Sequence, residues 1–161
     1  MDDVTIREDD LTGAAVVGLL QQHLAEMASH TPAESVHAMD VQRLSGADVT
    51  FWSAWSGDRI AGCGALKELD PTHAEIKSMR TSDDFRGTGV GKLLLVHLLA
   101  QARDRGYARV SLETGSNPPF VAARRLYARY GFTECEPFAD YVPDPWSVFM
   151  TLDLAGSAAD R

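Results

Sequence analysis

The sequence contains few cysteines and fewer basic than acidic residues. Its two cysteines, Cys63 and Cys135, form neither a metal-binding spacing nor a disulfide framework, which favours a reducing cytoplasmic setting with both thiols free. Lys and Arg number 15 against 23 Asp and Glu, a net charge of −8, whereas nucleic-acid-binding proteins usually carry a basic face. The composition therefore argues against a nucleic-acid partner. It is compatible with a cationic substrate, or with an acidic surface that serves only solubility.

Long apolar runs are also missing. No segment approaches the length needed to cross a bilayer, and the acidic start "MDDVTIREDD" lacks the apolar stretch of a secretory signal peptide. We therefore expect no membrane partner and a cytoplasmic location. The 161 residues are 45% hydrophobic and include no low-complexity linker, which predicts a single domain over residues 1–161 with a sizeable core and a frayed tail at 155–161.

The elements predicted from hydrophobic periodicity alternate between strands and helices. They are a strand at 4–8, a helix capped by Asp9 or Asp10, one or two short helices at 31–44, strands at 49–55, 59–69 and 74–82, a helix at 92–105, a strand at 108–114, a helix capped by Asn117, and late strands near 132–138 and at 147–154. Gly62 and Gly64 indicate a close backbone neighbour. Three successive strands with short turns exclude a doubly wound sheet and predict a mixed α/β domain.

Three glycines lie close together in "FRGTGVGKLLL" (Phe85–Leu95), between a predicted strand and a predicted helix. A triphosphate-binding loop would need glycine at Arg86 and a hydroxyl residue at Leu93. A dinucleotide fingerprint would need its third glycine at Lys92 or Leu94. Both templates fail, and an Arg-x-x-Gly-x-Gly pattern remains. Backbone N–H groups there, together with the positive end of the following helix, suit a pyrophosphate, although a purely structural turn is the alternative interpretation.

Two segments resemble the GNAT superfamily of acyl-CoA-dependent N-acetyltransferases. "EIKSMRTSDDFRGTGVGKLLL" (75–95) is similar to that family's fourth strand, pyrophosphate loop and third helix, and "ARRLYARYGF" (123–132) is similar to its L-Y-x-x-x-G-F segment. The order of predicted elements matches over nearly the whole chain, and "AEIKSMRT", "LETGS" and "DPWSVFM" look like small bacterial members whose acceptor is often unassigned. The resemblance implies an α/β (α+β) fold: a mixed, mostly antiparallel sheet with a central splayed parallel strand pair and about four helices around it.

The resemblance also implies acetyl-CoA as co-substrate and no metal. The cofactor is expected where the strands of Met79 and Leu112 splay apart, with its pantetheine along the main chain of residues 79–81 and with the N–H of Met79 as an oxyanion donor. The cofactor-binding residues that it implies are Met79, Arg80, Thr81, Arg86, Gly87, Thr88, Gly89, Val90, Gly91 and Lys92. The sequence departs from the family at Phe120, where an asparagine often touches the pantetheine.

In such enzymes the amine attacks the thioester directly. Glu75 matches a strand position where many members carry a glutamate, so it is the candidate base, acting directly or through water. The alternative is a sheet-face carboxylate paired with Lys77. Alternation along the strand places Glu75, Lys77 and Met79 on one face. Tyr127, the tyrosine of the L-Y motif, is the candidate acid for the leaving thiolate, and a structural core aromatic is the alternative.

The acceptor site is less well specified by the sequence. Glu113, at the end of a strand, is a candidate to bind the substrate amine, and the segment 29–40 is expected to wall the acceptor site, with His37 as a candidate contact. The segment 138–147 is expected to close the other side through Tyr141 and Trp146.

The predicted function is transfer of an acetyl group to a small or amino-acid-like amine. A non-catalytic acyl-CoA-binding regulatory module is the alternative, and the failed templates disfavour a nucleotide-binding protein. The sequence is also compatible with a homodimer, which is frequent in the family.

Overall fold

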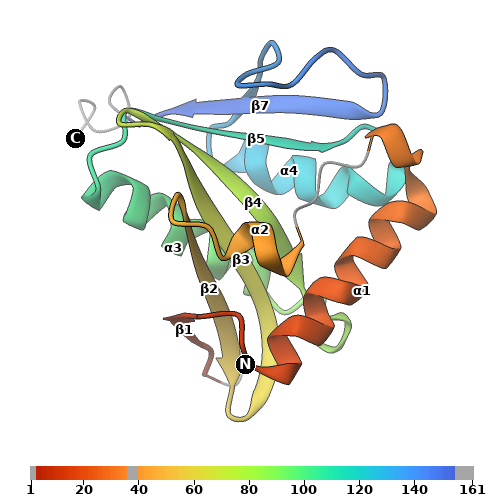
Figure 1. Cartoon of the computed structure of the whole chain (residues 1–161), viewed down its shortest axis with the longest axis vertical. Coiled ribbons are helices and arrows are strands. Elements are labelled where there is room, and N and C mark those ends of the chain that lie inside the picture. Colours follow the sequence, from red (N-terminus) through yellow and green to blue (C-terminus); the bar gives the residue numbers. More distant parts are fainter. Residues whose placement is uncertain (1–2, 36–39, 155–161) are drawn as a thin grey trace.

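The computed structural model describes residues 3–35 and 40–154, which form a seven-stranded sheet with helices on both faces (Figure 1). The strands are β1 (Thr5–Glu8), β2 (Val49–Ser56), β3 (Arg59–Asp70), β4 (His73–Thr81), β5 (Arg109–Gly115), β6 (Thr133–Glu134) and β7 (Ser147–Asp153). The helices are α1 (Ala14–His30), α2 (Val41–Leu44), α3 (Val90–Asp104) and α4 (Val121–Arg129), with 3₁₀ turns at Ala33–Ser35, Asp83–Phe85 and Pro118–Phe120. The predicted fraying of the tail at 155–161 concerns residues outside this description.

The sheet confirms the predicted mixed topology. Its strand order is β1-β2-β3-β4-β5-β7-β6, and neighbouring strands are antiparallel except for β4 and β5, which are parallel. A parallel pair needs a crossover connection, and α3 supplies it. The parallel pair lies at the centre of the sheet, as expected.

Helices cover both faces of the sheet (Figure 1). On one face α3 and Tyr127 of α4 pack against apolar residues of five strands and seal a core that includes Leu98, Ile76 and Leu112. On the other face the apolar side of α1 and Leu44 of α2 pack on β2 and β3. Helices thus pack on both faces of the central strands. Side chains near the ends of these strands are therefore held in defined positions.

The parallel pair opens into a V before it ends. β4 and β5 are paired only from His73 opposite Arg109 to Ile76 opposite Leu112, although both strands continue further. Beyond that point β4 contains a bulge at Ser78, which has φ 55°. A bulge bends its strand and increases the local twist, and β4 diverges from β5 in this region (Figure 1).

The bulge corrects the prediction that Glu75, Lys77 and Met79 share a face. Lys77 Nζ contacts the hydroxyl of Tyr141 at 2.9 Å, and Glu75 accepts from the same hydroxyl. The sulfur of Met79 instead lies 3.3 Å from where a Cβ on Gly64 would stand, on the face of the sheet that packs against α3. The prediction was wrong because strict alternation assumes a strand without an extra residue.

Gly62 of β3 has the close backbone neighbour that its position predicts. A Cβ there would lie 2.6 Å from the carbonyl oxygen of Arg80 and 2.9 Å from Leu94 of α3. The absence of a side chain therefore lets the end of β4 and the start of α3 lie close together over β3.

Two helix caps differ from the predictions. Gly13, rather than Asp9 or Asp10, precedes α1, and it has no side-chain cap. Both aspartates instead accept hydrogen bonds from the backbone N–H two residues ahead. Asn117 stands at the start of the turn before α4, but its side chain donates to the carbonyl of His30 rather than capping.

The predicted strand near 132–138 is reduced to the two residues of β6. The following chain carries Pro137, Pro143 and Pro145, which lack the N–H group that a strand ladder requires. This chain forms a loop whose side chains contact β4 and β7 and contribute to the site described below.

Candidate active site

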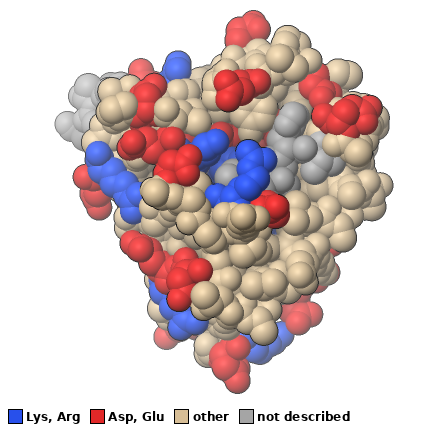
Figure 2. Space-filling view, viewed as in Figure 1, with Lys and Arg blue, Asp and Glu red and all other residues tan. Residues whose placement is uncertain are grey.

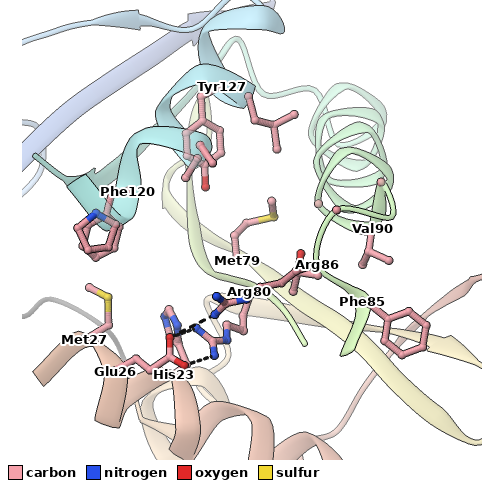
Figure 3. A pocket seen from close by; sticks show the side chains of 18 of the residues that line it. His23, Glu26, Met27, Met79, Arg80, Phe85, Arg86, Val90, Phe120 and Tyr127 are labelled. Carbon is pink, nitrogen blue, oxygen red and sulfur yellow. Dashed lines mark hydrogen bonds and ion pairs between the residues drawn. The ribbon is translucent and has the colours of Figure 1, made fainter. Parts of the chain in front are cut away.

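A cavity of about 580 Å³ lies where β4 leaves β5, between α1, α4 and the glycine-rich loop (Figure 3). Most of the residues that the sequence predicted for cofactor binding line it: Met79, Arg80, Thr81, Arg86, Gly87, Gly89, Val90 and Gly91. Thr88 and Lys92 do not. The end of β4, the glycine-rich loop and the first turn of α3 therefore form one wall of the cavity.

The glycine-rich loop turns sharply into α3. Gly87 and Gly89 have φ of 76° and 92°, which a side chain would disfavour. The first backbone hydrogen bond of α3 runs from the N–H of Leu93 to the carbonyl of Gly89, so the preceding N–H groups of the helix have no partner within it. Because the loop lines the cavity, the positive end of α3 is available to an anion there.

Two arginines and one glutamate supply the charge of this cavity wall. The guanidinium of Arg80 donates to both carboxylate oxygens of Glu26, at 2.6 and 2.8 Å. Arg86 lies 3.5 Å from Glu26 and 2.9 Å from Asp83. The hydrogen bond from Arg80 lowers the pKa of Glu26 to about 2, so this carboxylate is charged at every physiological pH.

A smaller cavity, of about 100 Å³, lies between the splayed strands. Its polar lining consists of Lys77 and Ser78 from β4, Glu113 and Thr114 from β5, and His23 from α1. It shares Met79, Tyr127 and Phe120, among others, with the larger cavity. The two cavities therefore adjoin, and a group held in one can reach a group held in the other.

Tyr127 stands at this junction, at the end of the larger cavity formed by α4 (Figure 3). Its ring packs edge-on against Phe132, with centroids 5.8 Å apart, and its side chain belongs to the main core. Burial, with the nearby Glu113 carboxylate, raises the pKa of its hydroxyl. The ring is therefore part of the core and its hydroxyl lies beside the cavities, while its role as an acid stays a prediction.

Glu113 is the carboxylate that reaches the smaller cavity. Ser147 Oγ donates to it at 2.7 Å, and burial raises its pKa to about 7. A carboxylate with this pKa exchanges protons readily near neutral pH.

Glu75 lies deeper than the sequence suggested. Its residue is 2% exposed and lines neither cavity. Its carboxylate accepts from the hydroxyl of Tyr141 at 2.6 Å and lies 3.3 Å from Lys77 Nζ. The structure thus contains the pairing with Lys77 that was the alternative interpretation, and a proton could reach Glu75 only through another group such as Tyr141 or a water molecule.

The expected walls of the acceptor site are partly described. Tyr141 of the 138–147 loop covers Glu75 and Lys77, whereas Trp146 is 38% exposed and lines neither cavity. His37 lies outside the residues that the structure describes.

Sequence reasoning missed the contribution of α1. His23, Glu26 and Met27 line the larger cavity, and His23 and Met27 also line the smaller one. The helical spacing of His23 and Met27 had suggested only an apolar face for this helix, and Glu26 lies outside that pattern. Burial, together with the charge of Arg80, lowers the pKa of His23 to about 4, so its imidazole is neutral. A polar residue on an otherwise apolar face was the signal available in the sequence.

The remaining surface adds three observations. No group of three or more His, Cys, Asp or Glu side chains within residues 3–35 and 40–154 is arranged to hold a metal ion. Over the same residues, no helix has both the length and the apolarity that a membrane span requires. Acidic side chains are spread over the face seen in Figure 2 with basic ones between them, so this face carries no continuous basic surface.

Comparison with known proteins identifies this architecture. The model of the acetyltransferase (GNAT) family matches residues 19–132. The chain is 56% identical over 149 residues to the uncharacterized N-acetyltransferase YsnE of Bacillus subtilis, covering 92% of this chain and 99% of YsnE. It is also 30% identical to a Klebsiella pneumoniae protein assigned as an acyl-CoA N-acyltransferase, with a TM-score of 0.76 and coverage of 94% and 97% of the two chains.

A more distant structure has the same fold. A GNAT family acetyltransferase from Elizabethkingia anophelis, solved with acetyl-CoA bound, superposes with a TM-score of 0.70 at 19% identity and covers 95% of this chain and 99% of its own. At this identity the likeness concerns the fold and not individual side chains.

Proposed function

This chain belongs to the GNAT family of N-acetyltransferases, and on that premise we propose that it transfers the acetyl group of acetyl-CoA to the amine of a small-molecule or amino-acid-like acceptor. The observation that carries the proposal is the pair of adjoining cavities. The wall of the larger cavity contains the N-terminus of α3 and two arginines. The smaller cavity contains the carboxylate of Glu113, whose pKa is raised, and Tyr127 lines both cavities.

The larger cavity fits the two polar parts of coenzyme A. The N–H groups at the start of α3 and the guanidinium of Arg86 would hold its diphosphate. Arg80 and Thr81 pair with β3 on one side, and residues 79–81 pair with no strand on the β5 side. That free edge would pair with the amides of pantetheine, as an added strand does. Acetyl-CoA supplies the activated acyl group when bound.

The reaction forms a C–N bond and breaks the C–S bond of the thioester. The amine nitrogen attacks the carbonyl carbon, and the N–H of Met79 would stabilise the negative charge that develops on the carbonyl oxygen. The departing sulfur needs a proton, and Tyr127, kept protonated by burial, would donate it. The amine must give its surplus proton to a base.

Two carboxylates are candidates for that base. Glu113 lines the smaller cavity, so we assign it the contact with the incoming ammonium group and the acceptance of its proton. Glu75 would act only at one remove, through Tyr141 or water, because it is buried and lines neither cavity. Its negative charge would also neutralise that of Lys77, and so keep the Lys77 side chain in its place in the lining of the smaller cavity.

The test is release of free thiol from acetyl-CoA in the presence of a panel of small amines and amino acids. Tyr127→Phe should lower kcat by about 10²-fold, in the range typical of general acid–base groups, while CoA affinity changes little. Tyr130→Phe is the matched control, because it removes a hydroxyl from the same region of the chain without altering the lining of either cavity.

Two outcomes would contradict the proposal. If CoA binds tightly and no acceptor is turned over, the chain is a non-catalytic acyl-CoA-binding module. If CoA does not stabilise the protein in a thermal-shift titration, the assignment of the larger cavity is wrong.

A further inference from the structure

The larger cavity contains one carboxylate in the part where a diphosphate is expected. Among the described residues that line it, the side chains with a fixed charge are Arg80, Arg86 and Glu26. Glu26 comes from α1, and both arginines come from the other side of the cavity, from β4 and the glycine-rich loop. Figure 3 shows the glutamate and the arginines meeting across the cavity floor.

Glu26 contacts both cations. It forms the two-pronged hydrogen bond with Arg80, with oxygen-to-nitrogen distances of 2.6 and 2.8 Å, and it lies 3.5 Å from Arg86. A carboxylate held in this way has the charge and the planar pair of oxygens with which guanidinium groups bind phosphates. It therefore occupies donors that a diphosphate would otherwise use.

We propose that Glu26 is a built-in anion that competes with the diphosphate of coenzyme A for Arg80 and Arg86, and so sets the affinity of the site for its acyl donor. The inference rests on the proposed function, because it takes the larger cavity as the acyl-CoA site. It adds a specificity-determining residue from α1, an element outside the phosphate loop.

Arg80 and Arg86 differ in how far their side chains are exposed, and therefore in how easily each can release Glu26 and bind a diphosphate. The side chain of Arg80 is 9% exposed and that of Arg86 is 59% exposed. Arg86 can thus turn from Glu26 and Asp83 to an incoming diphosphate, whereas Arg80 depends mainly on Glu26, with Asp83 at 3.4 Å, to offset its buried charge. Replacing Glu26 should consequently weaken the unliganded fold and strengthen anion binding, and these two effects have opposite signs.

The experiment is calorimetric titration of wild type and Glu26→Gln with CoA and with inorganic pyrophosphate. Glutamine keeps an oxygen that accepts from Arg80 but removes the charge. We expect both ligands to bind Glu26→Gln about three- to tenfold more tightly, the size of a partly exposed charge interaction. Pantetheine, which lacks the diphosphate, should stabilise the two proteins equally in a thermal-shift titration.

Asp84→Asn is the matched control. It removes one acidic charge from the 3₁₀ turn next to the loop, where Asp84 pairs with Arg59 at 3.2 Å, but it leaves the lining of the cavity unchanged. Its affinity for CoA should equal that of wild type. An equal gain in Asp84→Asn would mean that overall charge, and not the position of Glu26, sets the affinity.

The melting temperature separates competition from a structural role. Without ligand, Glu26→Gln should melt below wild type, and saturating CoA should raise its melting temperature by more than it raises that of wild type. Equal or weaker CoA binding by the folded variant overturns the proposal. If Glu26→Gln does not fold, Glu26→Asp serves instead, because its shorter carboxylate should compete less, and unchanged or weaker CoA binding again overturns it. Failure of wild type to bind CoA would instead refute the proposed function.

Discussion

The two halves of the candidate site are built differently. The larger cavity takes one wall from two short stretches of chain, residues 79–81 and most of residues 85–91, and the groups proposed to bind the diphosphate are backbone N–H groups at the start of α3. The smaller cavity is lined by side chains from α1, β4, β5, α4 and the turn before α4, and most of these elements are far apart in the sequence. Two polar side chains of this lining, Lys77 and Glu113, contact Tyr141 of the 138–147 loop and Ser147 at the start of β7.

This difference separates a binding site that many sequences of one fold can share from a site that is particular to one sequence. A backbone site needs glycines at two positions and a helix behind them, so many sequences can keep it. A side-chain site changes with each substitution, so we expect the acceptor to depend on residues that the common motifs leave open. Substitutions in the smaller cavity should therefore affect turnover, and substitutions in the larger cavity should affect binding of CoA.

The largest expected effect lies on the acceptor side. Glu113→Gln should lower kcat/KM by about 10²- to 10⁴-fold, because the amine loses its proton acceptor, and should leave CoA affinity within about twofold of wild type. The measurement is steady-state kinetics of thiol release together with calorimetric titration of CoA. Glu8→Gln, a strand carboxylate on β1 away from both cavities, is the control.

Glu75→Gln tests the same assignment from the other side. It should lower turnover less than Glu113→Gln, since the proposal gives Glu75 only an indirect part, through Tyr141 or water. A greater loss in Glu75→Gln would move the base back to Glu75. If either Glu113→Gln or Glu75→Gln also lost affinity for CoA, the larger and smaller cavities could not be assigned to separate ligands.

An intermediate effect is expected on the cofactor side. Gly89 has φ 92°, and no atom lies within 4 Å of a Cβ placed there, so a valine would be opposed by backbone strain rather than by a clash. Relief of that strain should turn the N–H groups of the loop away from the cavity. CoA affinity in Gly89→Val should fall about ten- to hundredfold by calorimetric titration.

Gly57 provides the control for this strain. It has φ 61° and similarly open surroundings, in the turn between β2 and β3 away from the cavities. Gly57→Val should lose stability with no change in CoA affinity. If the two variants bound CoA equally well, the glycine-rich loop would not be the diphosphate site.

The smallest expected effect is a pH dependence of stability. The folded-state pKa of Glu113, about 7, lies above its ordinary value of 4.5, so the folded protein binds this proton more tightly than the unfolded chain does. Stability from this group is complete below about pH 4.5 and is lost as the pH rises to about 7. Glu113→Gln should therefore melt roughly 3–8 °C above wild type at pH 8 and close to wild type at pH 4.5.

Scanning calorimetry at the two pH values measures this directly. Glu8→Gln should show no such pH-dependent difference from wild type. Equal melting of Glu113→Gln and wild type at pH 8 would mean that Glu113 is not a buried carboxylate, and its assignment as the base would lose its physical support.

Local pattern predicted most elements, and it failed at particular places for particular reasons. The glycine-rich loop and α3 could be read from the sequence because turns and apolar periodicity act over a few residues. The bulge at Ser78 could not, and it moved Met79 to the opposite face from Lys77. The pairing of Glu75 with Tyr141 joins residues 66 positions apart, and no local pattern specifies such a contact.

The chain by itself determined the family, the order of strands and helices, and the glycine-rich turn ahead of α3, because each follows from interactions between near neighbours in the sequence. The tertiary structure alone decided that Glu113 and not Glu75 faces the smaller cavity, and that Glu26 of α1 meets the arginines of the larger one. Burial and charge pairing depend on which segments pack together, and that packing exists only once the sheet has formed and the helices cover it.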